Sequence, residues 1–196
     1  MRRNIILMAS VLTLAAASGA SAQGLTISVT GGGYQQASSF ATLKSGIQEM
    51  NVDAGSTLSF GGNIELGSLR LSAAYASGAT IEQHGISGKI GEGSLLAASA
   101  DLVMRPFPRL LGLQPYLLGG LGFKRTDFDL TGDGLPLDFK EYKAESKFAF
   151  HWGLGADVMF GRIGFMAEIS DYVTVSDNAF KAHDAFGVVG LKLRLF

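Results

Sequence analysis

The sequence predicts an all-β fold, namely a closed antiparallel up-and-down transmembrane β-barrel of about eight strands. Three observations predict it. A leader-like segment opens the chain, apolar and polar residues then alternate with a period of two, and short connections alternate with long ones. Together they indicate an exported chain that crosses a membrane with strands.

The leader-like segment has the layout of a secretory signal peptide. Arg2 and Arg3 are followed by an apolar stretch over residues 5–17 and by the small residues Ala20-Ser21-Ala22, which fit an A-x-A cleavage site. We therefore expect a signal peptide at residues 1–22, cleaved after Ala22, and one outer-membrane barrel domain at 23–196. The alternative is an uncleaved helical anchor, although the stretch is shorter than the roughly 20 residues that a spanning helix needs.

Composition narrows the class of protein. Residues 1–22 hold two of the 16 basic residues and none of the 17 acidic ones, so the remaining 174 residues carry a net charge of −3. That is enough chain for one domain, and the weak charge argues against nucleic acid as a partner. The chain has no cysteine, which excludes disulfides, thiol nucleophiles and cysteine-ligated metals.

The period-two alternation is clearest over residues 147–160. Even positions there, such as Phe148, Trp152 and Leu154, are apolar, whereas odd positions, such as His151 and Asp157, are polar, charged or small. This split predicts strands with one apolar face. It recurs in seven further segments: 25–30, 58–66, 69–75, 96–102, 116–124, 163–170 and 189–195.

The connections differ in length from one end of the predicted strands to the other. Gly67-Ser68 and Gly161-Arg162 have the pattern of two-residue type II′ turns, and the third connection on that side, 105–114, is longer and carries two prolines. The other connections are predicted as long polar loops: 34–55, 78–93, 125–145 and 174–183. Short turns at one end and long loops at the other are typical of outer-membrane barrels.

The two-residue turn at Gly67-Ser68 also fixes a register. It places Glu65 opposite Arg70 on the polar face, and Phe60 opposite Tyr75 on the apolar face.

Alternation alone leaves two orientations open, because the apolar face of a soluble barrel points inward. Lipid contact is favoured by the small residues between the charges of the polar face, which suit a narrow lumen. It is also favoured by aromatic residues near the expected edges of the apolar band. These are Phe60, Tyr75, Phe123, Phe148, Phe150 and Trp152 toward the loops, and Phe160 toward the turns.

With lipid outside, seven charged residues of the polar faces point into the lumen: Glu65, Arg70, Asp101, Asp157, Glu168, Lys192 and Arg194. Eight strands enclose a space only wide enough for side chains. We therefore expect these residues to pair as a lumen ionic network. Five of them are expected to form one connected plug: Glu65, Arg70, Glu168, Lys192 and Arg194.

Three stretches of sequence resemble one known family. They are the Gly-rich run Pro115–Gly122, the pair Gly153–Asp157 and Ala167–Tyr172, and the end Gly190–Phe196. They are similar to strands of the outer-membrane protein A-like transmembrane barrel in its small stand-alone form. The resemblance implies an eight-stranded barrel that serves envelope integrity, adhesion or serum resistance, or forms a weak pore. It also implies outer-membrane lipids, lipopolysaccharide and the barrel assembly machinery as partners, a monomer, and no cofactor.

The end of the chain departs from that family in two ways. It stops at the last strand, so we expect no peptidoglycan-binding domain. Terminal Phe196 resembles the family's assembly signal, but it is one step out of phase with the apolar face of Leu191, Leu193 and Leu195.

Two motifs raise the question of chemistry. His84-Gly85-Ile86-Ser87 invites a lipid hydrolase interpretation, but its spacing and Gly-rich loop do not make a triad, so no catalytic residue is assigned. His151 is interpreted as a structural lumen residue, and His183, beside Asp184, as a solvated rim residue.

In the third long loop Asp127, Asp129, Thr131 and Asp138 partly match the ligand positions of a calcium loop. The alternative is an acidic solvated loop, and no metal is assigned.

The leading functional hypothesis is therefore a structural or surface-interaction protein of the outer membrane. A narrow pore for ions or small solutes is the second hypothesis, and a lipid-modifying enzyme the third.

Overall fold

The computed structural model describes residues 24–36, 41–45, 48–83, 86–130, 145–176 and 179–196. These form ten strands: β1 (Leu25–Gln36), β2 (Ala41–Ser45), β3 (Gln48–Ala54), β4 (Thr57–Leu66), β5 (Leu69–Gln83), β6 (Ile86–Met104), β7 (Leu113–Leu130), β8 (Glu145–Phe160), β9 (Ile163–Ser176) and β10 (Ala179–Arg194). No helix in the described part of the chain is long and apolar enough to span a membrane.

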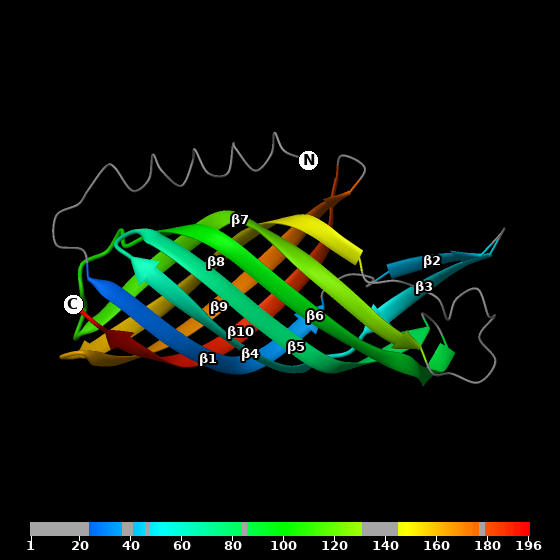
Figure 1. Cartoon of the computed structure of the whole chain (residues 1–196), viewed down its shortest axis with the longest axis horizontal. Coiled ribbons are helices and arrows are strands. Elements are labelled where there is room, and N and C mark those ends of the chain that lie inside the picture. The colour runs from blue at the N-terminus through cyan, green and yellow to red at the C-terminus, as the bar shows by residue number, and fades with distance from the viewer. Residues whose placement is uncertain (1–23, 37–40, 46–47, 84–85, 131–144, 177–178) are drawn as a thin grey trace.

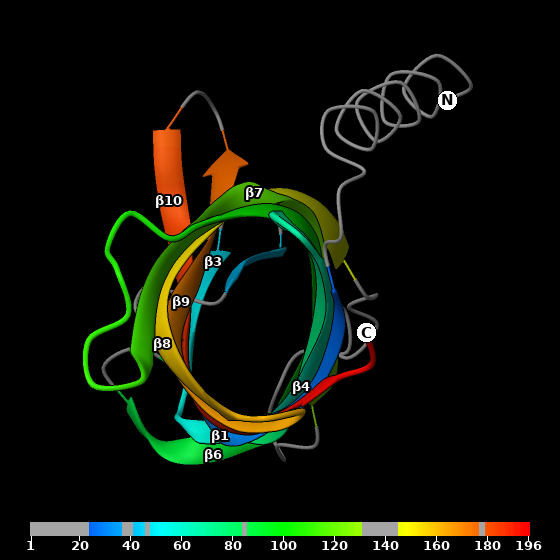
Figure 2. The same cartoon turned by 90° about the vertical axis from the view of Figure 1, so that its left-hand side faces the viewer.

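Eight of the strands close into a barrel. Strands β4 to β10 pair antiparallel with their neighbours in chain order, and β1 pairs with both β4 and β10. The pairing of β5 with β6 completes the ring, which Figure 2 shows end-on. The prediction of a closed antiparallel barrel of about eight strands is confirmed. Closure leaves no sheet edge within the ring, as a lipid environment requires.

The two short hairpins have the predicted register. Glu65 pairs with Arg70 and Phe60 pairs with Tyr75. Gly67 and Gly161 have φ angles of 62° and 67°, and among the described residues Leu111 is the only non-glycine with positive φ. A positive φ at the first central residue alone fits a type II′ turn. One end of the molecule, called here the turn end, holds these two turns and the 105–112 connection (Figure 1). The start of β1 and the end of β10 lie there as well.

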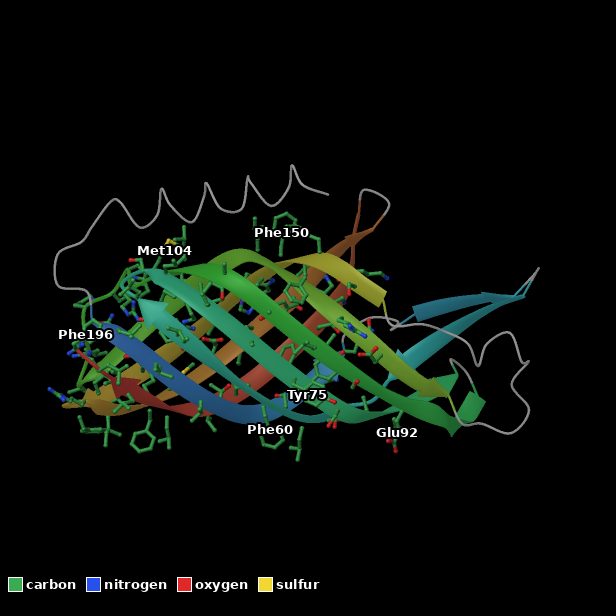
Figure 3. The ribbon with its side chains drawn as sticks, in the orientation of Figure 1. Phe60, Tyr75, Glu92, Met104, Phe150 and Phe196 are labelled. Atoms are coloured by element: carbon green, nitrogen blue, oxygen red, sulfur yellow. The ribbon has the colours of Figure 1, made fainter. Side chains whose placement is uncertain are left out.

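The apolar faces point outward and the charged faces inward. Phe60, Trp152 and Leu154 are 66%, 53% and 51% exposed, whereas Arg70 is fully buried in the barrel. All seven aromatic residues predicted at the edges of the apolar band are exposed, and Figure 3 shows Phe60 and Phe150 on the outside of the ribbon. A soluble barrel has the opposite arrangement, so the alternative with the apolar face inside is wrong.

The prediction of long polar loops is wrong for much of their length. Strands β5 and β6 continue through the 78–93 connection. The 34–55 connection contains a hairpin of β2 and β3, in which residues 52–54 of β3, the end nearest β4, pair with β5. Strands β7, β9 and β10 likewise run on into the 125–145 and 174–183 connections. Backbone hydrogen bonds extend these strands beyond the apolar band. Outside the band neither face needs to be apolar, so the alternation that signals a strand is lost.

A bulge marks the passage into that extension. The register of β5 against β6 shifts between Ala76 and Ala79, at Gly78, whose φ is 73°. Both alanines are buried although they lie three residues apart. The parity of inward positions therefore changes at Gly78, as expected for an extra residue in one strand.

Candidate functional site in the barrel lumen

Each of the seven charged residues predicted for the lumen lies on an inward-facing position. Glu65, Arg70, Asp101, Asp157 and Lys192 are at most 6% exposed, and Glu168 and Arg194 are partly buried. The structure places six of them in two separate groups, leaves Arg194 outside both, and adds partners that the sequence did not indicate.

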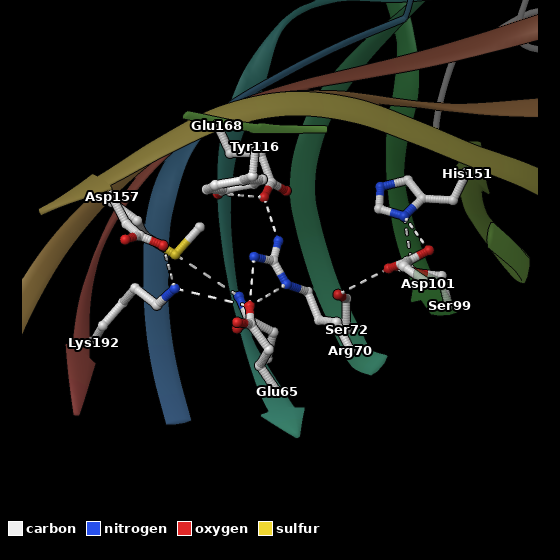
Figure 4. Close-up of polar contacts among 12 residues, drawn as sticks. Glu65, Arg70, Ser72, Ser99, Asp101, Tyr116, His151, Asp157, Glu168 and Lys192 are labelled. Carbon is white, nitrogen blue, oxygen red and sulfur yellow. Dashed lines mark hydrogen bonds and ion pairs between the residues drawn. The ribbon is translucent and has the colours of Figure 1, made fainter. Parts of the chain in front are cut away.

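The first group lies near the turn end and is called here the turn-end cluster. It consists of Glu65, Arg70, Arg105, Asp157, Glu168 and Lys192. Figure 4 shows these residues except Arg105. Nη2 of Arg70 lies 2.9 Å from Oε2 of Glu65, and its Nη1 lies 2.5 Å from Oε2 of Glu168. Nζ of Lys192 lies 2.7 Å from Oδ2 of Asp157 and 3.8 Å from Oε2 of Glu65.

The contact of Arg70 with Glu168 crosses the barrel. Arg70 lies on β5 and Glu168 on β9, which are four positions apart in a ring of eight strands and therefore face each other. Tyr116 of β7 stabilises the crossing: its hydroxyl donates to Oε2 of Glu168 at 2.8 Å, and Cζ of Arg70 lies 4.8 Å from its ring centroid. A buried guanidinium needs such a set of acceptors to offset its lost hydration.

Membership of this cluster differs from the predicted plug at two residues. Arg105 follows β6 at the turn end and returns into the lumen, where it pairs with Glu65 and lies 3.8 Å from Asp157. The period-two pattern gave no signal for it, because it lies outside the alternating segment. Arg194 was predicted in the plug, but no ion pair among the described residues includes it. It lies beyond Lys192, toward the mouth of the lumen, and lines a cavity there.

The second group is centred on Asp101. Its Oδ2 accepts hydrogen bonds from Ser72 at 3.2 Å and Ser99 at 2.8 Å, and its Oδ1 lies 2.8 Å from Nδ1 of His151. The ring of His151 stacks on Tyr172 at 4.1 Å between centroids. His151 thus lies in the lumen as predicted, but its carboxylate partner is Asp101 of β6.

The geometry of Ser99, His151 and Asp101 does not form a nucleophile relay. Such a relay needs the serine on one ring nitrogen of histidine and the carboxylate on the other. Here Ser99 and Asp101 both contact Nδ1, at 3.0 and 2.8 Å. Of the motif singled out in the sequence, His84 and the side chain of Ser87 lie outside the described residues.

A third group, which the alternation of the sequence did not reveal, lies toward the loop end of the lumen. The hydroxyl of Tyr34 donates to Oδ1 of Asp184 at 2.6 Å, and Lys124 forms a short buried ion pair with Oδ2 of the same carboxylate. An apolar layer lies against it: Tyr34, Ala76, Leu95, Ala97, Ala149, Tyr172 and Phe186. The inward parity of Lys124 could have signalled a lumen cation, but its partner Asp184 lay in the segment interpreted as the rim.

The lumen opens at the turn end into a cavity of about 360 Å³. Arg105, Arg109 and Arg194 line it together with Lys192, Glu65 and Asp157, so the turn-end cluster forms part of its wall. Four cationic side chains thus gather at this mouth beside the carboxylates of Glu65 and Asp157.

The other predicted positions lie on the periphery. Asp127 pairs with Arg125 at 3.3 Å, while the side chain of Asp129 and the residues Thr131 and Asp138 lie outside the described residues. The described residues contain no group of three or more potential metal ligands. His183 is not simply a solvated rim residue, because its Nδ1 lies 2.6 Å from Oδ2 of Asp171 on the outer face of β9.

Comparison with known proteins decides the family. The description "Outer membrane protein beta-barrel domain" matches residues 5–191. The chain belongs to the outer membrane protein β-barrel family. Membership places it in the outer membrane, in agreement with the exposed apolar face and the buried charges.

Two solved structures are similar to this chain at low sequence identity. Neisserial surface protein A (NspA) is 12% identical, with a TM-score of 0.54, and the match covers 87% of this chain and 97% of that one. The N-terminal β-barrel domain of OprF from Pseudomonas aeruginosa is 14% identical, with a TM-score of 0.46, and the match covers 87% and 100%. No curated protein sequence matches the chain. The likeness to NspA concerns the fold alone.

Proposed function

We propose that this outer-membrane barrel has a structural or surface-interaction role in the cell envelope and that its lumen does not carry solutes. The observation that carries the proposal is the contact between Arg70 and Glu168. It joins opposite walls of the barrel with two charged groups that are at most 9% exposed. An ion moving along the axis would have to break this contact and strand both charges.

Two further layers support a closed lumen. The Asp101 group joins β5, β6, β8 and β9, and the apolar layer around Tyr34 and Phe186 lies beyond it toward the loops. Ions cross apolar constrictions poorly, because such constrictions exclude water. The proposed role is therefore that of a rigid membrane anchor for the segments that extend beyond the apolar band.

Planar bilayer recording tests the closed lumen. The purified chain, refolded and reconstituted, should give no steady conductance step, and Arg70→Met together with Glu168→Leu should raise the frequency of brief openings. A steady, porin-sized conductance in the unmutated protein would contradict the proposal. Two further measurements should accompany the recording. Cell fractionation should find the protein in the outer membrane, and a gel should show that the folded barrel changes mobility on boiling.

The alternative is a narrow pore for ions or small solutes. It is favoured by one observation, the polar mouth of about 360 Å³ at the turn end. The same recording separates the two functions. We regard a lipid-modifying enzyme as the weakest candidate, since both partners of His151 contact the same ring nitrogen.

The partners of the barrel and the processing of its N-terminal segment are part of the proposed function. We propose that outer-membrane lipids and lipopolysaccharide surround a monomeric barrel, and that the barrel assembly machinery recognises its C-terminal end. Removing Phe196 should lower the yield of assembled protein in the membrane. N-terminal sequencing of the exported protein should begin at Gln23 if residues 1–22 are the signal peptide.

A further inference from the structure

A small pocket lies within the lumen between the turn-end cluster and the apolar layer. Glu168 of the cluster and Tyr172 and Phe186 of the layer form part of its wall, together with Asn63 and His151. Its volume is about 30 Å³. One water molecule needs roughly 10–15 Å³ of such volume, so the pocket has room for about two.

Two residues that line the pocket, Asn63 and His151, each have a buried polar atom without a hydrogen-bond partner among the described residues. These atoms are Oδ1 of Asn63 and Nε2 of His151. Both residues are deeply buried, at 8% and 3% exposure. Buried polar atoms are satisfied in the great majority of cases, by protein or by ordered water. The pocket therefore combines space with unmet hydrogen-bonding capacity.

The contacts of Asp101 fix which nitrogen of His151 carries the hydrogen. Its carboxylate, which only accepts hydrogen bonds, already receives those of Ser72 and Ser99 at Oδ2. Nδ1 of His151 is therefore the donor to Oδ1 of Asp101 at 2.8 Å. In the neutral ring the other nitrogen, Nε2, is then an acceptor. Oδ1 of Asn63 is an acceptor as well, so the occupant of the pocket must supply hydrogens.

We propose that this pocket is a water-binding site, in which one or two water molecules donate hydrogen bonds to Nε2 of His151 and Oδ1 of Asn63. Water is the small molecule that donates twice and also accepts, and the hydroxyl-bearing residues Thr30 and Ser170 line the same pocket. The bound water links β4 to β8 across the barrel, where no direct side-chain contact is described. It makes the middle of the lumen a fixed polar layer.

Nuclear magnetic resonance of the whole refolded chain in detergent micelles tests the site. With ¹⁵N-labelled histidine, His151 should show a protonated Nδ1 and an unprotonated, hydrogen-bonded Nε2. Its ring proton next to Nε2 should show a cross-relaxation peak to water. The imidazole signals are assigned by a His151→Gln variant, since the chain has two other histidines.

Two neighbouring alanines of β5 offer matched variants. Both line the pocket, but Ala74 lies on the inward-facing parity, whereas Ala73 lies on the exposed outer face. Ala74→Val adds two methyl groups toward the pocket and should abolish the water peak at His151. Ala73→Val makes the same chemical change toward lipid and should keep it.

Three results would overturn the site: no water peak at His151 in the unmutated chain, a hydrogen on Nε2 in place of Nδ1, or a water peak that persists in Ala74→Val. If Ala74→Val does not fold, Asn63→Leu replaces it, because leucine removes one acceptor and occupies the pocket, and loss of the peak is again expected. The conductance of the barrel is measured separately. A steady pore would contradict the proposed function, while a water peak that disappears only on filling the pocket would still establish the site.

Discussion

Arg70 on β5 and Glu168 on β9 form an ion pair across the barrel, with 2.5 Å between Nη1 and Oε2, although 98 residues separate them in the chain. The same guanidinium also contacts Glu65 at 2.9 Å through Nη2. The buried guanidinium of Arg70 therefore binds two carboxylates on different strands. Removing this guanidinium should weaken the anchoring of both Glu65 and Glu168.

Arg70→Met should destabilise the barrel by about 3–5 kcal/mol, because it leaves Glu168 in the lumen without its cation and removes one of the three cations around Glu65. Lys192→Met should cost less, since Glu65 keeps Arg70 and Arg105, and Asp157 keeps Arg105 at 3.8 Å. Urea unfolding in lipid vesicles gives both values. The control is Arg162→Met in an exposed turn, which should stay within about 0.5 kcal/mol. A loss for Lys192→Met equal to that for Arg70→Met would contradict this account of the cluster.

The buried pair of Lys124 and Asp184 should behave as a unit. Asp184→Leu alone should cost about 3–5 kcal/mol, because it leaves an uncompensated ammonium in the lumen. Adding Lys124→Met should recover most of that loss, since replacing both charges of a buried pair by apolar groups is often neutral. A double-mutant cycle by urea unfolding measures the coupling. Additive losses from the two substitutions would show that the pair does not act together.

Leu154 and Gly155 test the two faces of β8 at neighbouring positions. Leu154 is 51% exposed on the outer face, so Leu154→Arg should cost about 2–4 kcal/mol if it lies near the midplane of the bilayer. A Cβ atom at Gly155 would lie 2.5 Å from the ring of Tyr116, so Gly155→Arg should fail by overfilling the lumen. Spin labels give the direct measurement. A label at Leu154 reached by water-soluble rather than lipid-soluble quenchers would reverse the assignment of the faces.

The sequence was sufficient to predict the strands within the apolar band and the side that each residue faces. Alternation has a period of two in any strand, so Glu65, Arg70 and Lys192 could be placed inward without coordinates. The register of the Glu65–Arg70 hairpin could also be predicted, because a two-residue turn leaves one pairing.

Which lumen residues meet could not be predicted in the same way. Contacts across the lumen, such as Lys124 with Asp184, depend on the tilt and stagger of all eight strands, which no local pattern encodes. Arg105 was missed because it lies in a turn yet its long side chain reaches back to Glu65. The extension of β5 was missed because the bulge at Gly78 changes which positions face inward, so a strict period of two ends there.

Gly119 and Gly120 of β7 provide a final test of how tightly the barrel wall is packed. A Cβ atom at Gly120 would lie 2.1 Å from the carbonyl oxygen of Ala100 and 2.5 Å from Oδ1 of Asp101, whereas one at Gly119 would meet no atom within 4 Å. Gly120→Ala must therefore push β6 away from β7 and disturb the carboxylate that holds His151. We expect a loss of about 1–3 kcal/mol, as for other overpacked sites. Gly119→Ala should be neutral or stabilise by about 0.4–1 kcal/mol, because alanine restricts the unfolded chain. Urea midpoints in vesicles, read from the fraction that shifts on boiling, compare the two variants with the unmutated protein. Equal midpoints for both variants would mean that the wall can relax around Gly120, and that the close approach of β6 does not require glycine there.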